Sequence, residues 1–353
     1  MDFALSDEQK MLQESARRFF AERHPLSRTR RALQWSDEAQ RGLWRDMAGM
    51  GWLGLLAAEE QGGLELGMCE AFLVAEAAGR QLLNLPFASS AVLLPLLLRA
   101  SAQPDGGLAH WVGEVVAGRA AINLSFDGML FIDHDRQCSH QWLVRGLRDG
   151  EAGIALTQWP CAAEDEERPW AEPAGLDPSL RSARMVPGAV RADSGPTLVW
   201  DALNMTEGDR AFALACYRMA RIGELLGAAG ASLDLSCDYA RQREQFGKPI
   251  GSYQAIKHHL ANAWMALDNA RLAALYAVAS LDGALPDWSF ACAAAELTAI
   301  EGCLRMGRAA IQIHGGLGFT WEHDAHLYLK RIHHVCAMLG GTEAAYEALE
   351  RAI

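Results

Sequence analysis

The stretch from Tyr239 to Ala261 combines side chains that together are able to bind a flat, negatively charged ligand. Arg241 and Arg243 stand near the end of one helical pattern, Phe246 and a glycine interrupt it, and Gln254 lies one turn inside the next expected helix. A guanidinium forms paired hydrogen bonds with a phosphate, an aromatic ring stacks, and an amide both donates and accepts. The residue types therefore predict an anion-binding corner between two helices.

Arginines at the end of a helix also have a simpler explanation. They interact favourably with the negative end of the helix dipole, typically by about 0.3–1 kcal/mol, and need no ligand. Here, however, an aromatic residue, a glycine and a short turn at Pro249 and Gly251 follow the arginines directly, and a new helix is expected from Ser252. This arrangement brings a cation, a ring and an amide to one corner, which favours ligand binding.

A second candidate is the glycine-rich segment that runs from Gln312 to Phe319. Glycines after a long helix commonly do no more than end it. Two adjacent glycines, here Gly315 and Gly316, also let backbone N–H groups approach a phosphate or a ribityl chain, because no Cβ stands in the way. The segment would serve the same ligand as Arg243 if the helices bring the two together.

Composition limits the other partners of the chain. The 353 residues carry a formal net charge of −12, which argues against a general nucleic-acid surface or an anionic membrane surface. The eight cysteines are scattered without a CxxC pair, so we expect reduced core thiols and a cytoplasmic protein. No signal peptide is expected, because acidic residues interrupt the N-terminus, and the apolar run at 91–98 is too short to span a bilayer.

Histidines are frequent between residues 314 and 334, which raises the question of a metal. His323 and His326 stand one helical turn apart, but their spacing matches no familiar ligand pattern, and no obvious cysteine or carboxylate completes a set. We therefore expect no metal site.

Periodicity divides the chain into three parts, at 1–112, 113–205 and 206–353. The first is expected to be helical: Ser6 and Gln9 form a capping-box pattern, and further helices are expected around 43–50, 68–83 and 89–100. The second shows short strand-like runs at 120–124, 142–144, 153–157 and 197–200. The third is expected to be an antiparallel bundle with helices at 209–243, 252–281, 288–313, 322–338 and 342–352.

The helical, β, helical order resembles a known family when it is combined with three segments: MGWLGLLAAEEQGGLELG from residue 50, RQREQFGKPIGSYQAIKHHLA from residue 241, and QIHGGLGFT from residue 312. Together they resemble the acyl-CoA dehydrogenases, flavoproteins that desaturate an acyl-CoA between Cα and Cβ. The resemblance covers both helical parts well and the middle loosely. It implies a mostly α fold with a small β module, in which an N-terminal helical domain and a middle β domain precede a C-terminal four-helix bundle.

The resemblance also implies roles for the candidate residues. Arg243 and Phe246 match the positions that hold the pyrophosphate and adenine side of FAD, and Gln254 matches a contact in the next helix. Gln312, with the glycine pair 315–316, matches the turn that closes over the adenosine end. In that family these groups reach across a subunit interface to the neighbouring chain's flavin. The resemblance therefore implies a dimer or a dimer of dimers.

The catalytic base of the family has no counterpart in this sequence. Family members supply a glutamate before a Gly-Thr pair near the C-terminus, or on the first bundle helix before an arginine; these positions hold Gly340 and Tyr217 here. A glycine has no proton acceptor, and a tyrosine with its ordinary pKa of about 10 is a poor base at neutral pH. Glu343 is displaced by three residues and Glu224 by about two helical turns. We therefore expect no intact active site.

The middle part also lacks residues that the family uses, in this case the residues that contact the flavin ring. The segment that contacts the flavin ring, Thr-Glu-Pro followed by Gly-Ser, appears here as Ile122–Phe126 without Glu, Pro or Gly-Ser, and no convincing Trp-Ile-Thr segment follows. The resemblance thus points to the short, non-catalytic subunit of a heteromeric dehydrogenase for bulky acyl-CoA thioesters, such as those with steroid side chains. A longer catalytic partner, in a complex with two copies of each subunit, would supply the base and the flavin-ring contacts.

Two alternatives stay open. The chain could be a self-sufficient homotetrameric dehydrogenase with a relocated base, for which Glu343 and Glu224 are the candidates. It could also be a helical scaffold or binding protein that kept the fold and lost the cofactor. Flavin and activity in the isolated chain would favour the first alternative, and absence of flavin even with the partner would favour the second.

Overall fold

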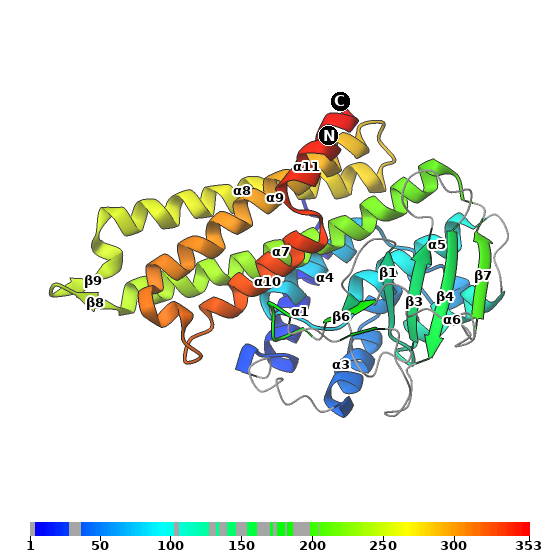
Figure 1. Cartoon of the computed structure of the whole chain (residues 1–353), viewed down its shortest axis with the longest axis horizontal. Coiled ribbons are helices and arrows are strands. Elements are labelled where there is room, and N and C mark those ends of the chain that lie inside the picture. Colours follow the sequence, from blue (N-terminus) through cyan, green and yellow to red (C-terminus); the bar gives the residue numbers. More distant parts are fainter. Residues whose placement is uncertain are drawn as a thin grey trace. The chain divides into compact units, whose positions relative to one another are not determined.

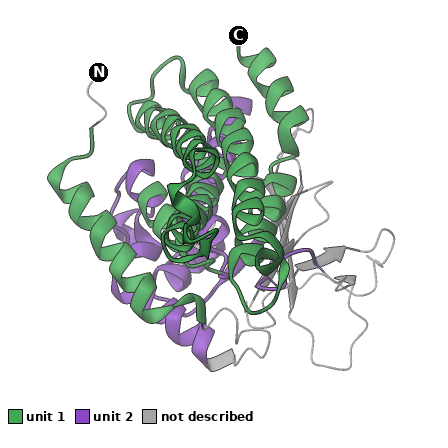
Figure 2. Ribbon diagram, turned by 90° about the vertical axis from the view of Figure 1, so that its left-hand side faces the viewer, with its two compact units in different colours: residues 1–30, 72–83, 218–353 green, residues 31–71, 84–217 purple. Residues whose placement is uncertain are grey.

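The structure is a computed structural model, and it describes residues 4–27, 37–101, 106–126, 132–133, 140–145, 154–160, 170–171, 175–180, 182–185, 198–203 and 205–353. The chain forms two compact units, shown in green and purple in Figure 2. Unit 1 contains residues 1–30, 72–83 and 218–353, and unit 2 contains residues 31–71 and 84–217. Each unit is therefore assembled from segments that are far apart in the sequence.

Unit 2 begins with short helices that surround a glycine-rich loop. They are α3 (Asp37–Gly49), the 3₁₀ turns η2 (Trp52–Gly54) and η3 (Glu59–Gln61), and the first residues of α4 (Met68–Arg80). A π-helical turn η4 (Ala88–Leu93), α5 (Leu94–Ala100) and α6 (Gly106–Val116) follow. The six residues of η4 are all buried, which agrees with the helix that the sequence predicts from residue 89.

The β part of unit 2 holds a four-stranded and a three-stranded sheet. The order in the first is β1 (Ile122–Phe126), β3 (His140–Arg145), β4 (Ile154–Pro160) and β7 (Leu198–Leu203). β1 and β3 are parallel and the other neighbours antiparallel, as can be followed in Figure 1. The second sheet has the order β2 (Ile132–Asp133), β6 (Ser182–Met185) and β5 (Trp170–Ala171). The four strand-like runs of the sequence are confirmed, and the second sheet was not predicted.

Buried hydrogen bonds fix the position of β1. The Ser90 hydroxyl donates to the Ile122 carbonyl oxygen at 2.7 Å and accepts from the Ile122 N–H at 2.8 Å. The Trp44 indole N–H donates to the Ala120 carbonyl at 2.8 Å. These bonds satisfy backbone groups that would otherwise lose their water without compensation on burial. Helices η4 and α3 therefore hold the start of the sheet in place.

Unit 1 is a bundle of long helices. Its members are α1 (Asp7–Arg23), α4 from residue 72, α7 (Glu207–Gln242, from residue 218), α8 (Gln254–Asp282), α9 (Trp288–His314), the 3₁₀ turn η6 (Gly315–Phe319), α10 (Ala325–Met338) and α11 (Gly341–Ala352). The predicted capping box is confirmed, because the Ser6 hydroxyl accepts from the Gln9 N–H at 3.2 Å and the Gln9 Oε1 accepts from the Ser6 N–H at 3.0 Å. The five C-terminal helices lie close to the predicted ranges; α10 begins three residues later than predicted.

Helix α4 packs against α7 with almost no space between the backbones. A Cβ on Gly227 would lie 2.0 Å from the Glu76 carbonyl oxygen, and a Cβ on Gly79 would lie 2.1 Å from the Glu224 carbonyl oxygen. Such distances are far below van der Waals contact, so only glycine is compatible with this crossing. The crossing fixes the position of the middle of α7. The same helix carries Tyr217, which stands at one of the two base positions of the family.

The described cysteines agree with the expectation of reduced thiols in the core. Cys216, Cys292, Cys303 and Cys336 are buried in the helical core, and burial raises the pKa of Cys292 and of Cys336 to about 12. The described cysteines are free thiols, as predicted for a core role. Within the described ranges, no helix has both the length and the apolar character needed to cross a bilayer.

Candidate functional site

The predicted corner after α7 is a β-hairpin. The two-residue strands β8 (Glu244–Gln245) and β9 (Lys248–Pro249) pair antiparallel, and the chain reverses at Phe246 and Gly247. Both have positive φ angles, +53° and +78°, as in a type I′ turn. The chain therefore reverses at Phe246 and Gly247, where the sequence predicted the end of the helical pattern, and the predicted short turn at 249–251 follows as a separate feature. This short turn is the 3₁₀ turn η5 (Ile250–Ser252), which follows Pro249 and leads into α8.

Phe246 combines two unfavourable properties. Its side chain is 93% exposed, and a bulky non-glycine residue with positive φ is strained by roughly 1 kcal/mol or more. Both the exposed apolar ring and the positive φ of Phe246 are unfavourable for the isolated chain. Residues of this kind concentrate at sites where a ligand or partner covers them.

The hairpin is nevertheless firmly attached to the helices beside it. The Ile250 N–H donates to the Arg243 carbonyl at 2.8 Å, and the Tyr253 hydroxyl donates to the Gln245 carbonyl at 3.0 Å. Gly251 lies so close to the end of α7 that a Cβ would stand 2.9 Å from the Ala240 carbonyl oxygen. The tip residue is thus held in a defined position.

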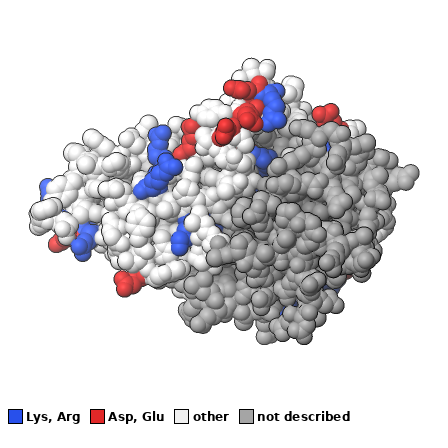
Figure 3. Space-filling view, in the orientation of Figure 1, with Lys and Arg blue, Asp and Glu red and all other residues white. Residues whose placement is uncertain are grey.

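The two arginines of this stretch differ in their surroundings. The Arg241 guanidinium forms an exposed ion pair with Asp238 at 2.8 Å. Arg243 is exposed, and no carboxylate of the described residues pairs with it. Gln254, the first residue of α8, is also exposed. On the face shown in Figure 3, Lys and Arg side chains lie at the hairpin end of the bundle together with a few Asp and Glu side chains. An anion would thus meet an unpaired cation here.

The glycine-rich segment follows α9 as predicted. Gln312, Gly315 and Gly316 are exposed, and a Cβ on either glycine would meet nothing within 4 Å. Gly315 has φ of +60°, whereas Gly318 folds back so that its Cβ would stand 3.1 Å from that of His314. The first two glycines therefore present open backbone, and the third closes the turn.

A stack of rings connects the two candidate stretches. The Tyr239 ring, near the end of α7, lies on the His314 ring with centroids 4.4 Å apart, and His314 lies on His323 at 4.3 Å. Burial lowers the pKa of His314, and the nearby His323 lowers it further, while the bond to the Ala310 carbonyl opposes the shift. The structure therefore brings Arg243 and the 312–316 turn to the same end of the bundle. The sequence analysis missed the stack.

At the two base positions the structure has an arginine network. The Arg218 guanidinium forms an ion pair with Glu296 and donates to the Leu339 carbonyl at 2.7 Å. Gly340, the next residue, has φ of +92°, and a Cβ on it would stand 2.8 Å from that of Ala344. A glutamate at this position would be strained in its backbone and would clash with α11.

The proposed substitutes for the base are poorly placed. Glu224 accepts from Arg221 at 2.9 Å and from the fully buried Arg331 at 3.0 Å, so its carboxylate is held between two cations. Glu343 is exposed in the first turn of α11. Tyr217 is 4% exposed and bears no carboxylate. Among the described residues, no group of three His, Cys, Asp or Glu side chains is arranged to hold a metal ion.

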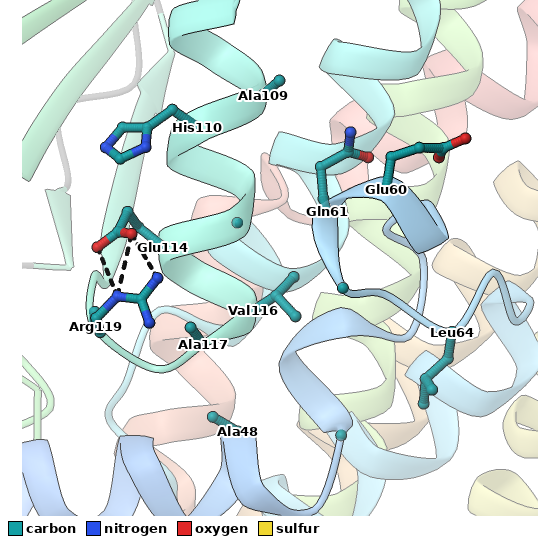
Figure 4. Close-up of a pocket in the computed structure, with 13 residues that line it drawn as sticks. Ala48, Glu60, Gln61, Leu64, Ala109, His110, Glu114, Val116, Ala117 and Arg119 are labelled. Carbon is teal, nitrogen blue, oxygen red and sulfur yellow. Dashed lines mark hydrogen bonds and ion pairs between the residues drawn. The ribbon is translucent and has the colours of Figure 1, made fainter.

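Unit 2 contains a groove of about 710 Å³ that none of the predicted site residues lines. Its wall is formed by α6 and the loop around η3, with His110 and a Glu114–Arg119 ion pair at 2.7 Å on one side and Glu60 and Gln61 on the other (Figure 4). The Arg119 charge is already neutralised by Glu114, so the groove offers no free cation for an anionic cofactor.

Comparison with known proteins identifies the family. The model for the acyl-CoA dehydrogenase N-terminal domain matches residues 6–103, and the C-terminal domain model matches residues 211–353. IpdE2 of Mycobacterium tuberculosis, an acyl-CoA dehydrogenase, is 30% identical over 347 residues, which cover 98% of this chain and 96% of IpdE2. The acyl-CoA dehydrogenase FadE34 of the same organism is 32% identical over 311 residues, 86% of this chain but 41% of FadE34. The chain therefore belongs to the acyl-CoA dehydrogenase family.

Solved structures agree on the fold. The ChsE4–ChsE5 complex from Mycobacterium tuberculosis contains a chain with a TM-score of 0.79 and 20% identity, covering 99% of this chain and 98% of that one. A variant of the Tcur3481–Tcur3483 steroid ACAD has a TM-score of 0.77 and 21% identity, covering 98% and 97%. The chain thus has the acyl-CoA dehydrogenase fold that the sequence predicted.

Proposed function

We propose that the chain is the non-catalytic subunit of an FAD-dependent acyl-CoA dehydrogenase, and that it holds the adenosine and pyrophosphate end of a flavin whose ring lies in a catalytic partner subunit. The residues proposed for this role are Arg243, Phe246, Gln254, Gln312, Gly315 and Gly316. The flavin supplies a hydride acceptor, and the partner supplies the base that takes the α-proton of the acyl-CoA. This chain contributes cofactor binding.

The observation that carries the proposal is the exposed, strained Phe246 beside the unpaired Arg243. A pyrophosphate would neutralise the guanidinium, and a cofactor or partner surface would cover the ring. Gly315 and Gly316 leave open space above their backbone, as a close phosphate approach requires. The residues present therefore fit the far end of a dinucleotide.

Neither family position holds a base in this chain, which supports the proposal that the partner subunit supplies the base. A carboxylate is needed within hydrogen-bond reach of Cα, but position 340 has a glycine whose conformation disfavours side chains. The ion pairs that hold the Glu224 carboxylate between Arg221 and Arg331 would have to break before Glu224 could accept a proton. Breaking a buried pair typically costs about 3–5 kcal/mol.

Relatives support a bulky acyl-CoA substrate and a partner. One solved neighbour is a complex of two proteins, and another is a steroid ACAD named for two proteins. A steroid side chain esterified to CoA is therefore our proposed substrate class for the complete enzyme. Within this chain we propose that residues 1–112 and 113–205 form the N-terminal and middle domains and 206–353 the bundle that contributes to FAD.

A purification of the chain alone and with the acyl-CoA dehydrogenase encoded beside it tests the proposal. We expect the lone chain to carry no stoichiometric flavin and the co-purified complex to show flavin absorbance. If the lone chain binds FAD and desaturates an acyl-CoA, it is the self-sufficient enzyme, and Glu343 or Glu224 must act as the base. If neither preparation contains flavin, the chain is a scaffold and the cofactor role is wrong.

A further inference from the structure

The His314 side chain has features that its neighbours in the glycine-rich segment lack. It is 3% exposed, and its Nδ1 lies 2.7 Å from the Ala310 carbonyl oxygen. A carbonyl only accepts, so Nδ1 carries the proton and Nε2 is an acceptor. Nε2 is buried and has no hydrogen-bond partner among the described residues. A buried acceptor without a partner is destabilising, so packing or function must account for the histidine.

The ring contacts of His314 supply that reason. Its plane is inclined by 29° to the Tyr239 ring and by 48° to the His323 ring, with centroid distances of 4.4 and 4.3 Å. His323 in turn accepts from the Ala325 N–H through Nδ1 at 3.3 Å, at the start of α10. The three rings thus join the ends of α7 and α9 to the beginning of α10.

Two of the three rings are close in sequence to a proposed cofactor contact. Tyr239 accepts at its carbonyl oxygen the backbone N–H of Arg243 at 2.8 Å, and His314 directly precedes Gly315. Gly318 folds back so closely that a Cβ on it would stand 3.1 Å from the Cβ of His314. A shift of the His314 ring would therefore move both stretches.

We propose that His314 is a positioning residue that sets the 312–316 turn and the Arg243 stretch at a fixed distance through its stack with Tyr239. The inference rests on the proposed function, since the distance matters only if one ligand contacts both stretches. The ring, rather than the Nδ1 hydrogen bond, carries the coupling, because the Nδ1 bond to Ala310 stays within α9, whereas the stack reaches Tyr239 on α7.

Hydrogen exchange measured on the full chain tests the coupling without any flavin. We expect His314→Ala to raise amide exchange in both residues 240–253 and residues 312–322, by about three- to tenfold, as loss of one aromatic pair predicts. Tyr239→Leu should raise exchange in residues 312–322 as well, although the substitution lies on another helix. Tyr346→Leu, which removes a ring from α11, should change neither segment.

Two conservative variants separate the ring from the hydrogen bond. His314→Phe keeps a ring and loses the Nδ1 donor, and it should exchange like the parent chain in both segments. His314→Asn keeps a donor and loses the ring, and it should behave like His314→Ala. The opposite pattern, or a change confined to the segment that bears the substitution, overturns the proposal. Because the readout contains no cofactor, its failure is distinct from a failure of the FAD role, which flavin content reports.

Discussion

The Arg218 guanidinium donates a hydrogen bond of 2.7 Å to the Leu339 carbonyl oxygen, immediately before the position where the family places a catalytic glutamate. The same guanidinium pairs with Glu296, which is 3% exposed. A partly buried ion pair and a left-handed glycine therefore lie at this position. The relationship explains in physical terms why simple restoration of a carboxylate would not restore a base.

We expect Gly340→Glu to destabilise the chain and to give no dehydrogenase activity. The backbone at this residue has φ of +92°, which costs a residue with a Cβ about 1–2 kcal/mol, and the contact with Ala344 adds to that. Urea unfolding and an acyl-CoA desaturation assay on the lone variant measure both effects. Desaturation by this variant would show that the chain needs only the missing carboxylate to be an enzyme.

Gly316→Ala and Gly315→Ala are a matched pair of variants that test whether a cofactor phosphate lies close to the backbone of the glycine turn. A methyl group on Gly316 meets nothing within 4 Å, so we expect unchanged stability and weaker FAD binding in the complex. Gly315→Ala adds strain of about 1–3 kcal/mol because φ is +60° and ψ is −140°, a backbone region that residues with a Cβ rarely adopt. Thermal unfolding and flavin content separate the two effects. Normal flavin content in Gly316→Ala would argue against an approach of the cofactor to this backbone.

The close crossing of α4 and α7 predicts a large effect from a single methyl group. Gly227→Ala would place Cβ 2.0 Å from the Glu76 carbonyl oxygen, so we expect a loss of about 1–3 kcal/mol in the free energy of unfolding. The matched control is Gly42→Ala in α3, where nothing lies within 4 Å and a helix-favouring residue should be neutral or stabilising. Equal stability of the two variants would contradict the observed crossing.

Stability should decrease in mild acid. Burial lowers the pKa of His314 and of His333 below the ordinary value of 6.5, so the folded state binds fewer protons than the unfolded state below that pH. The free energy of unfolding is then greatest above about pH 6.5 and falls as the pH drops towards the folded-state pKa values. Denaturant titrations between pH 5 and 7 measure the slope. His314→Phe should reduce the slope. An unchanged slope would show that His314 does not contribute to the pH dependence of the free energy of unfolding.

Local sequence patterns were sufficient to predict the helices. They were not sufficient to predict contacts between segments that are far apart in the sequence. The capping box of α1 and the bundle helices follow from residue types a few positions apart. The ring stack joins Tyr239 to His314, and the Ser90 hydroxyl reaches Ile122, so both depend on how distant segments pack. The exposure and positive φ of Phe246 likewise required the structure.

The candidate cofactor residues came partly from chemistry and partly from resemblance. Arg243, Phe246 and Gln254 stood out as a cation, a ring and an amide at one corner, and the structure places the first two on the hairpin stretch between α7 and α8. Their assignment to FAD stays a prediction, as do the roles of Gln312 and the glycine pair 315–316. The positions without a base were recognised only through the resemblance, since no spacing marks an absent carboxylate.

The flavin content of the complex with Arg243→Ala tests the central claim most directly. The parent complex, Arg243→Ala and the control Arg305→Ala, which removes an exposed arginine from α9, would be purified with the partner subunit and their FAD-to-protein ratios compared. Loss of a guanidinium from a pyrophosphate costs about 2–5 kcal/mol, so we predict that Arg243→Ala loses most of its flavin while Arg305→Ala retains it. Full flavin occupancy in Arg243→Ala, with the complex intact, would contradict the account.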